Sequence, residues 1–273
     1  MARQEAEHWK IEDLDFSRIA LDEVRSDENL FYLVVSASFI ESGSDLYTQN
    51  LIDFFKGDDE VTEWLSNHWE KEELQHGKAL RAYVRHVWPE FEWDTAYAGF
   101  LEEYATYCKV ELLAPTRALE MTARCVVETG TATYYRAMAR STTEPVLHDL
   151  ATRIATDEVN HYKHFYRFFR RYREQEKLSR FRVFGTIGRR TLELKSEDAD
   201  CAIRHVVKSR SPGRASDTAY VQQLSAKMNS TIRTNLSAGT TLKMLMRPLE
   251  LPARVQTVIQ YPIKQFMQHV FLR

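Results

Sequence analysis

Cysteine is scarce in this chain of 273 residues, and the three that occur, Cys108, Cys125 and Cys201, are far apart with no Cys-x-x-Cys pair. This argues against a disulfide framework and a rubredoxin-like iron site, and it favours a reducing compartment. No apolar run approaches the roughly 18 residues that a membrane span requires, and residues 1–10 show no apolar signal segment. A P-loop, a dinucleotide-binding glycine fingerprint and a nucleophile elbow are also missing. We therefore expect a cytoplasmic protein without these three types of site.

Strand patterns are missing as well, and the sequence predicts an all-α fold. The formal net charge is only −2, but it is unevenly divided. Residues 1–178 contain 21 Lys and Arg against 33 Asp and Glu, whereas residues 179–273 contain 16 against 6. We interpret residues 1–178 as an acidic helical bundle with its core at about 27–176. Residues 179–273 form a basic helical extension that we expect to pack on the bundle, or on a second subunit of a homodimer.

Helical periodicity interrupted by strong breaks predicts the positions of the helices. Residues 1–26 form a leading arm or a short helix. The expected bundle helices cover 27–55, a segment from Asp58 or Asp59 to before Pro89, a segment from Pro115 to the break at 141–145, and about 145–175, with a connecting helix at 93–113. Further helices are expected at 180–209, 217–246 and 255–271. The long connection between the second and third helices is typical of four-helix bundles with one crossover.

One short pattern occurs twice in the expected bundle. The segments Glu73-Leu74-Gln75-His76 and Glu158-Val159-Asn160-His161 each place a carboxylate and an imidazole three residues apart on one helix face. Both groups can reach the same metal ion. A single copy is weak evidence, because Glu and His occur on many solvated helix faces, so the repetition carries the argument.

Each copy follows a helix that contains one isolated acid. Glu41 is the only charged residue in 29–44, and Glu128 is the only one in 125–135. Each is followed by a hydroxyl residue, a glycine and a second hydroxyl residue. The two halves of the bundle therefore repeat the isolated acid as well as the Glu-x-x-His pattern.

The spacing of these residues supplies an independent test. In an antiparallel helical hairpin, residues equidistant from the turn lie level with each other. The midpoint of Glu41 and Glu73 is Gly57, in a turn-like segment, and the midpoint of the second pair falls in the break before Pro145. Each hairpin therefore brings an isolated Glu level with a Glu-x-x-His.

Two such hairpins packed face to face place four carboxylates and two imidazoles around one point, which is the ligand set of a di-iron carboxylate bundle. Hard oxygen ligands combined with borderline nitrogen ligands favour iron or manganese over zinc. We predict that one metal ion is bound by Glu41, Glu73 and His76 and the other by Glu128, Glu158 and His161. Glu73 and Glu158 are the better candidates for bridging ligands, and Asp45 is a weaker alternative ligand.

Residues beside the predicted ligands complete the expected site. A metal-bound His usually donates its second N–H to a carboxylate or carbonyl, so Glu72 and Asp157 are each expected to accept from the His of the opposite hairpin. The alternative is a solvated acid. A glycine inside a helix costs about 1 kcal/mol relative to Ala, and small residues beside both ligand pairs suggest a cavity for dioxygen and substrate, with a π-bulge as one way to open it. Close helix packing is the alternative explanation. These small residues are Gly43, Ser44, Gly130, Thr131 and Ala132.

The two motifs resemble those of the ferritin-like di-iron superfamily. They are most similar to the acyl-acyl carrier protein desaturase signatures Glu-Glu-x-Arg-His-Gly and Asp-Glu-x-Arg-His, and they stand here as Glu72–Gly77 and Asp157–His161. The acids, the histidines and the first glycine match, whereas Gln75 and Asn160 replace the arginines of the family. These departures affect the surroundings of the ligands and the substrate. The resemblance covers about residues 27–176 and is more specific for the superfamily than for the desaturase branch.

The resemblance implies a ferritin-like four-helix bundle that holds two iron ions, or a manganese–iron pair, and oxidises an organic substrate with dioxygen. The substrate would present an unactivated C–H bond, as a fatty acyl chain does. The sequence has no flavin or iron–sulfur motif, so an external electron donor such as ferredoxin would be needed. An acidic acyl carrier protein is a candidate partner for the basic extension, and we expect no nucleic-acid partner.

Other activities of the same fold compete with this hypothesis. One is an aldehyde-deformylating or N-oxygenating di-iron enzyme. Another is a ferroxidase or a peroxide-scavenging ferritin-like protein, although the long extension exceeds what such a minimal bundle needs. A ribonucleotide reductase radical subunit is a weaker option, because nothing distinguishes a radical tyrosine from a core one.

Overall fold

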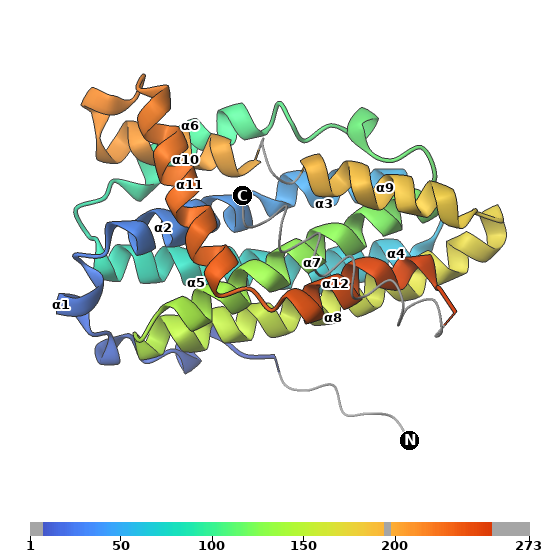
Figure 1. Ribbon diagram of the computed structural model, residues 1–273, viewed down its shortest axis with the longest axis horizontal. Helices are drawn as coiled ribbons and strands as arrows, with labels where there is room; N and C mark the ends of the chain where they lie inside the picture. Colours follow the sequence, from blue (N-terminus) through green and yellow to red (C-terminus); the bar gives the residue numbers. More distant parts are fainter. Residues whose placement is uncertain (1–7, 194–197, 253–273) are drawn as a thin grey trace.

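The structure, a computed structural model, describes residues 8–193 and 198–252. It is helical with no strand among these residues, and the all-α prediction is confirmed. Two antiparallel helical hairpins run along the long axis of the molecule (Figure 1). The helices of the first hairpin are α2 (Glu28–Ser42), α3 (Ser44–Phe54), α4 (Asp59–Trp64) and α5 (Glu70–Val87), and those of the second are α7 (Arg117–Ser141) and α8 (Pro145–Glu176).

Local chemistry places the two hairpin turns where the spacing of the acids predicts them. Gly57 has a φ of +89°, in the left-handed region that favours glycine. The side chain of Asp58 then accepts a hydrogen bond from the backbone N–H of Val61 and caps α4. In the second hairpin, Glu144 caps α8 in the same manner, and proline occupies the first position of that helix.

Three elements differ from the predicted helices. The helix expected at 27–55 is broken at Gly43, where an added Cβ would lie 3.4 Å from the ring of Tyr104. The break therefore coincides with a close approach to α6 (Trp93–Tyr104). The connecting helix ends at Tyr104, well before residue 113, and only a short 3₁₀ turn follows. A π-helical turn, Leu65–Trp69, joins α4 to α5.

The chain after the second hairpin forms four more described helices, namely α9 (Arg180–Glu193), α10 (Asp198–Arg210), α11 (Thr218–Thr234) and α12 (Ala238–Met246). Helices α9 and α12 pack on α7, α10 packs on α6 and α2, and α11 crosses α2 and α7 (Figure 1). Each of the helices expected at 180–209 and 217–246 is therefore two helices. The helix expected at 255–271 lies outside the described residues.

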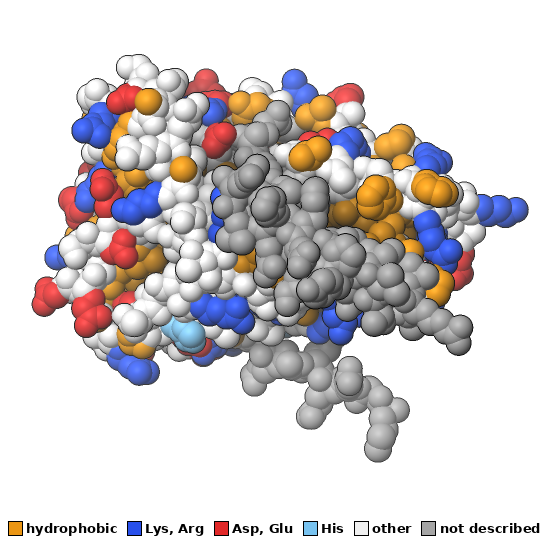
Figure 2. Space-filling view, viewed as in Figure 1, with side chains coloured by type: hydrophobic (Ala, Val, Ile, Leu, Met, Phe, Trp, Pro, Cys, Tyr) orange, Lys and Arg blue, Asp and Glu red, His pale blue; other side chains and the backbone are white. Residues whose placement is uncertain are grey.

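The extension exposes hydrophobic side chains on one of its helices, α9. Figure 2 shows hydrophobic side chains over α9, and the large exposed ones on this helix are Phe181, Phe184 and Leu192. None of the described helices is both long enough and apolar enough to cross a membrane.

The interior consists of two apolar clusters at opposite ends of the hairpins. One contains residues 30–39 of α2, 79–87 of α5 and 146–155 of α8. The other contains residues of α3, the π-helical turn and the later part of α8. The buried acids and histidines of the two hairpins fall between these clusters along every long helix. These buried acids and histidines form a layer, called here the polar belt, between the two apolar clusters.

Candidate metal centre

The six side chains predicted as metal ligands converge in this polar belt, and all six are buried. They form two overlapping groups, in each of which every ligand atom lies within 4.8 Å of the others. The first group is Glu41, Glu73, His76 and Glu158, and the second is Glu73, Glu128, Glu158 and His161. Glu73 and Glu158 belong to both groups, as expected of residues that would bridge two ions. Each group could hold a metal ion.

Both imidazoles turn their Nδ1 atom towards the carboxylates. The Nδ1 of His76 lies 3.4 Å from Glu158 Oε1 and 3.8 Å from Glu41 Oε2. The Nδ1 of His161 lies 3.1 Å from Glu73 Oε1 and 3.6 Å from Glu128 Oε2. The two ring centroids are 6.0 Å apart. Both Nδ1 atoms are buried, and carboxylates of the centre face them.

The opposite nitrogen of each ring is held by an acid of the other hairpin. The Nε2 of His76 lies 3.0 Å from Asp157 Oδ2, and the Nε2 of His161 lies 2.7 Å from Glu72 Oε2. A carboxylate beside Nε2 keeps a proton on that nitrogen, so the proton on the inward Nδ1 is the one that a metal ion would replace. Glu72 and Asp157 therefore occupy the positions expected of them.

Burial and the neighbouring charges shift the pKa values of three carboxylates of the centre. Burial, together with the charges of Glu158 and Glu41, raises the pKa of Glu73 well above its ordinary value. Burial likewise raises the pKa of Glu128 to about 8. Burial also acts to raise the pKa of Glu158, but hydrogen bonds from the two imidazoles prevail and lower it.

The histidines balance part of this charge. Burial acts to lower the pKa of His76 and of His161, but the surrounding carboxylates outweigh it and raise both values. Protons on imidazoles and carboxylates thus supply the positive charge that cations would otherwise bring. Four buried carboxylates and two inward Nδ1 atoms fit cations with oxygen and nitrogen ligands.

The small residues expected to line a cavity lie in different environments. Gly130 is exposed on the outer side of α7, so the expectation that it lines a buried cavity is wrong. Thr131 donates a hydrogen bond to Glu158 Oε2 at 3.0 Å, and Ala132 is fully buried. Gly43 packs against α6, which is the close packing named as the alternative, and the adjacent Ser44 hydroxyl is buried without a partner.

Two weaker alternatives, Asp45 as a ligand and a π-bulge beside the glycines, do not occur. Asp45 is exposed, and its carboxylate accepts a hydrogen bond from the backbone N–H of Leu46 at 2.9 Å instead of reaching the centre. The π-helical turn lies one turn before Glu73 and not beside the glycines. It forms where the bulky Trp64 and Trp69 both pack near His161.

The leading arm contributes a residue that the sequence patterns did not single out. The ring of Trp9 stacks on His76 with a centroid distance of 6.1 Å and an interplanar angle of 4°. Its indole N–H donates to Asp157 Oδ2 at 2.7 Å. Gln75 donates to the backbone carbonyl of Trp9 at 2.8 Å and thereby holds the arm against α5. Trp9 is one of several apolar residues in the arm, and nothing in the local sequence distinguishes it as a neighbour of the centre.

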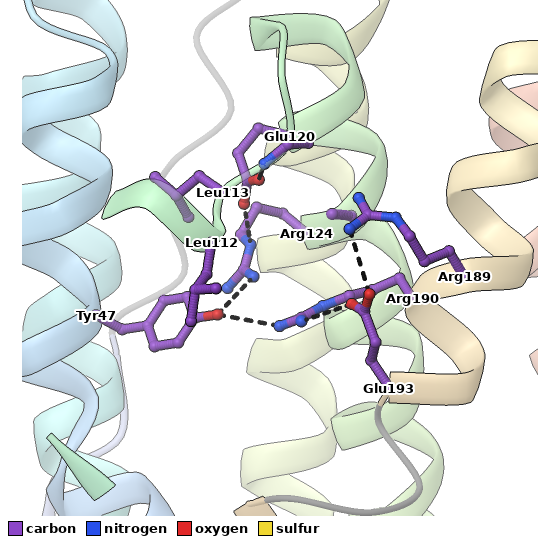
Figure 3. Close-up of a pocket in the computed structure, with 10 residues that line it drawn as sticks. Tyr47, Leu112, Leu113, Glu120, Arg124, Arg189, Arg190 and Glu193 are labelled. Atoms are coloured by element: carbon purple, nitrogen blue, oxygen red, sulfur yellow. Dashed lines mark hydrogen bonds and ion pairs between the residues drawn. The ribbon is translucent and has the colours of Figure 1, made fainter. Parts of the chain in front are cut away.

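A small polar pocket lies one helical turn from Glu128, with a cavity volume of about 10 Å³ that is enough for one water molecule. Figure 3 shows Arg124 and Arg190 directed at the phenol oxygen of Tyr47, with N–O distances of 3.4 and 3.0 Å. Arg124 is buried and pairs with Glu120 at 3.0 Å. The Tyr47 oxygen already accepts twice, so its own hydrogen is directed elsewhere. Arg190 pairs with Glu193 at 3.1 Å, so both arginines of the pocket have partners within the chain.

Comparison of the chain with models of known protein families, with curated proteins and with solved structures finds no match.

Proposed function

We propose that the chain is a di-iron oxidoreductase of the ferritin-like type that uses dioxygen and two external electrons to oxidise an unactivated C–H bond, such as one of a fatty acyl chain. The orientation of His76 and His161 carries this proposal. Each directs Nδ1 at buried carboxylates of the centre while an outside acid holds Nε2. This orientation would let Nδ1 bind a metal ion in place of its proton, and a carboxylate on the other ring nitrogen is the usual partner of a metal-bound histidine.

The residues divide into two metal positions. Glu41 and His76 serve one position and Glu128 and His161 serve the other, while the two shared glutamates reach both. Iron ions bound there would supply the electron transfer to dioxygen that this chemistry needs. The phenol of Tyr135 donates to Glu41 Oε1 at 2.5 Å and holds that carboxylate in place. The apolar clusters on either side keep bulk water away from the reacting groups.

The contacts of the leading arm suggest a route by which external electrons would reach the centre. Trp9 is half-buried, and its indole N–H, the Asp157 carboxylate and the His76 imidazole form a continuous hydrogen-bonded line from the surface to a predicted ligand. A donor protein such as ferredoxin would deliver electrons at this end of the line.

The polar pocket supports a substrate with an acidic group. Arg124 lies four residues before Glu128 on α7, so donors at Tyr47 and Arg190 are close to the centre along the helix axis. A fatty acid or a carrier-linked acyl group combines an apolar chain with an anionic part. Its acidic group would pair with Arg124 and Arg190 in place of the Glu120 and Glu193 carboxylates, because the free volume holds only about one water molecule.

Metal analysis tests the first half of the proposal. We expect two iron ions per chain in the protein reconstituted with Fe²⁺, and loss of both in Glu73→Ala combined with His161→Ala. The double variant Glu63→Ala with His68→Ala removes an exposed Glu and an exposed His and serves as the matched control. Unchanged iron content in the first double variant would refute the proposed centre.

Oxygen consumption tests the second half. The iron-loaded protein is supplied with a chemical reductant, with and without fatty acids, acyl thioesters, aldehydes and arylamines, and the products are identified by mass spectrometry. We expect oxidation of an acyl substrate coupled to dioxygen uptake. Rapid turnover of dioxygen and Fe²⁺ without any organic product would instead identify a ferroxidase.

A further inference from the structure

A second group of metal-binding side chains lies outside the centre, where α10 packs on α6. Cys201 and His205 are one turn apart on α10, and Glu103 lies near the end of α6. One ligand atom of each residue lies within 4.8 Å of the other two. Cys201 is fully buried, whereas His205 and Glu103 are half-buried. The group therefore has a closed inner side and an outer side that faces solvent.

Neighbouring residues hold the carboxylate of Glu103 in one orientation. Its Oε1 accepts a hydrogen bond from the Tyr107 hydroxyl at 3.1 Å and pairs with the Arg204 guanidinium. Its Oε2 lies 2.8 Å from His205 Nε2. One oxygen is thus anchored on the outside while the other faces the imidazole, the arrangement in which outer partners orient a metal-binding carboxylate.

A glycine makes room for the imidazole. A Cβ added to Gly99 would lie 3.1 Å from His205 Nδ1. The ring therefore lies directly against the backbone of α6. Any larger residue at this position would push His205 away from Glu103 and Cys201.

We propose that Cys201, His205 and Glu103 bind one Zn²⁺ ion, with a solvent molecule in the fourth position. A thiolate, an imidazole and a carboxylate are the three kinds of side chain that bind zinc, and three protein ligands with one open position is a known zinc arrangement. The thiolate and the carboxylate balance the charge of the ion, while Arg204 stays on the outer oxygen. The site contains sulfur, which distinguishes it from the oxygen- and nitrogen-based centre of the bundle.

The geometry requires little movement to accept the ion. Zinc–ligand bonds of about 2.0–2.3 Å place tetrahedral ligand atoms about 3.3–3.7 Å apart. The closest pair, at 2.8 Å, would open slightly, and the widest separation allowed by the group, 4.8 Å, would contract by about 1 Å. Burial, and after it the negative charge of Glu103, raises the pKa of the Cys201 thiol to about 12. Zinc binding would therefore displace the thiol proton.

The ion would fasten the extension to the first hairpin. Helix α10 contacts both α6 and α2, and α2 carries Glu41 of the bundle centre. A bond network that joins Cys201 and His205 of α10 to Glu103 of α6 would stabilise this packing, independently of the proposed oxidation chemistry.

Cobalt substitution tests the zinc site in the full-length protein. Co²⁺ bound to a thiolate gives a sulfur-to-cobalt charge-transfer band in the near ultraviolet, which oxygen and nitrogen ligands do not produce. We expect one such band per chain in the metal-free protein titrated with Co²⁺, and its loss when Zn²⁺ is added. The band should disappear in Cys201→Ser and persist in the matched variant Cys108→Ser, since Cys108 lies outside the group.

Two further variants separate this site from the bundle centre and from misfolding. Glu73→Ala with His161→Ala should lose metal at the bundle centre and retain the thiolate band. His205→Gln should weaken Co²⁺ binding at the thiolate at least tenfold while the helical circular dichroism remains that of the parent. Absence of the band in the parent, or its persistence in Cys201→Ser, would show that the three residues form only an ion-pair network and would overturn the proposal.

Discussion

The substitution Asp157→Asn tests how the bundle centre holds its ligands. A single oxygen of Asp157, Oδ2, accepts both the indole N–H of Trp9 at 2.7 Å and the Nε2–H of His76 at 3.0 Å. Asparagine has nearly the same shape and one oxygen that could accept both bonds, but it lacks the negative charge. The substitution therefore changes the basicity of the predicted ligand while leaving the packing almost intact.

The expected loss of metal affinity follows from the role of a carboxylate that accepts a hydrogen bond from a metal-bound histidine. Removing an outer partner of a metal-bound His typically lowers metal affinity about 10–100-fold, which corresponds to about 1.4–2.8 kcal/mol. The loss is larger if the asparagine turns its NH₂ group towards His76. The imidazole would then accept at Nε2, its proton would move to Nδ1, and the nitrogen that faces the carboxylates could no longer bind a metal. We expect the upper part of the range for this reason.

The assay is competition for Fe²⁺ between the protein and a chelator under anaerobic conditions, which gives the affinity of each variant. Glu72→Gln provides the comparison, because Glu72 holds His161 in the other half of the centre. Its side chain is more exposed, 16% against 9% for Asp157, so solvent should compensate part of the loss and the effect should be smaller. Unchanged iron affinity in Asp157→Asn would refute the argument that this carboxylate orients a metal ligand.

Three other predictions concern packing, protonation and electron delivery. In Gly77→Ala the new Cβ would lie 2.7–2.8 Å from the side chain and backbone of Ser42, so thermal and denaturant unfolding should show a loss of about 1–3 kcal/mol. The metal-free protein should lose stability as the pH rises from about 5 to 8, because Glu128 and His76 have raised pKa values in the folded state and must give up their protons. Metal loading should reverse this trend. In Trp9→Phe the reduction of the loaded centre by a protein donor should slow about tenfold, with unchanged metal content, in stopped-flow measurements.

Each of these three predictions has a clear contrary result. Gly188→Ala on α9 is the control for the packing change, because an added Cβ there meets nothing within 4 Å; equal effects at Gly77 and Gly188 would remove the steric explanation. A melting temperature of the metal-free protein that rises between pH 5 and 8 would contradict the raised pKa values. Unchanged reduction kinetics in Trp9→Phe would exclude the indole from the electron route.

The spacing of charged residues predicted much of the centre. Glu41 and Glu73 lie level because a hairpin has one geometric constraint, the position of its turn, and Gly57 marks that position in the sequence. An isolated acid in an apolar helix is also a strong signal, since a buried carboxylate is costly without a partner. The positions of Glu128 and Glu158 follow from the same two arguments.

Features that depend on contacts between distant segments could not be predicted in this way. The break at Gly43 arises where Tyr104 of another helix approaches, and Gly130, in the same local sequence, stays inside an unbroken helix and is exposed. The local sequence is similar at the two glycines, so the segments that pack against each glycine determine whether the helix breaks there. Trp9 reaches Asp157 across 148 residues of chain, and no periodicity connects the two.

The two halves of the centre match in their ligands and differ in what lies outside them. Asp157 is covered by the ring of Trp9, whereas Glu72 pairs with the exposed His8 at 3.0 Å. A charge in a drier environment interacts more strongly with its neighbour, so the carboxylate beside His76 acts more strongly than the one beside His161. Repetition of the hairpin thus accounts for two similar groups of candidate metal ligands, and the single leading arm makes their surroundings unequal. In the proposed enzyme, electrons would enter through the His76 side, because the half-buried Trp9 is hydrogen-bonded there to the acid that holds the histidine.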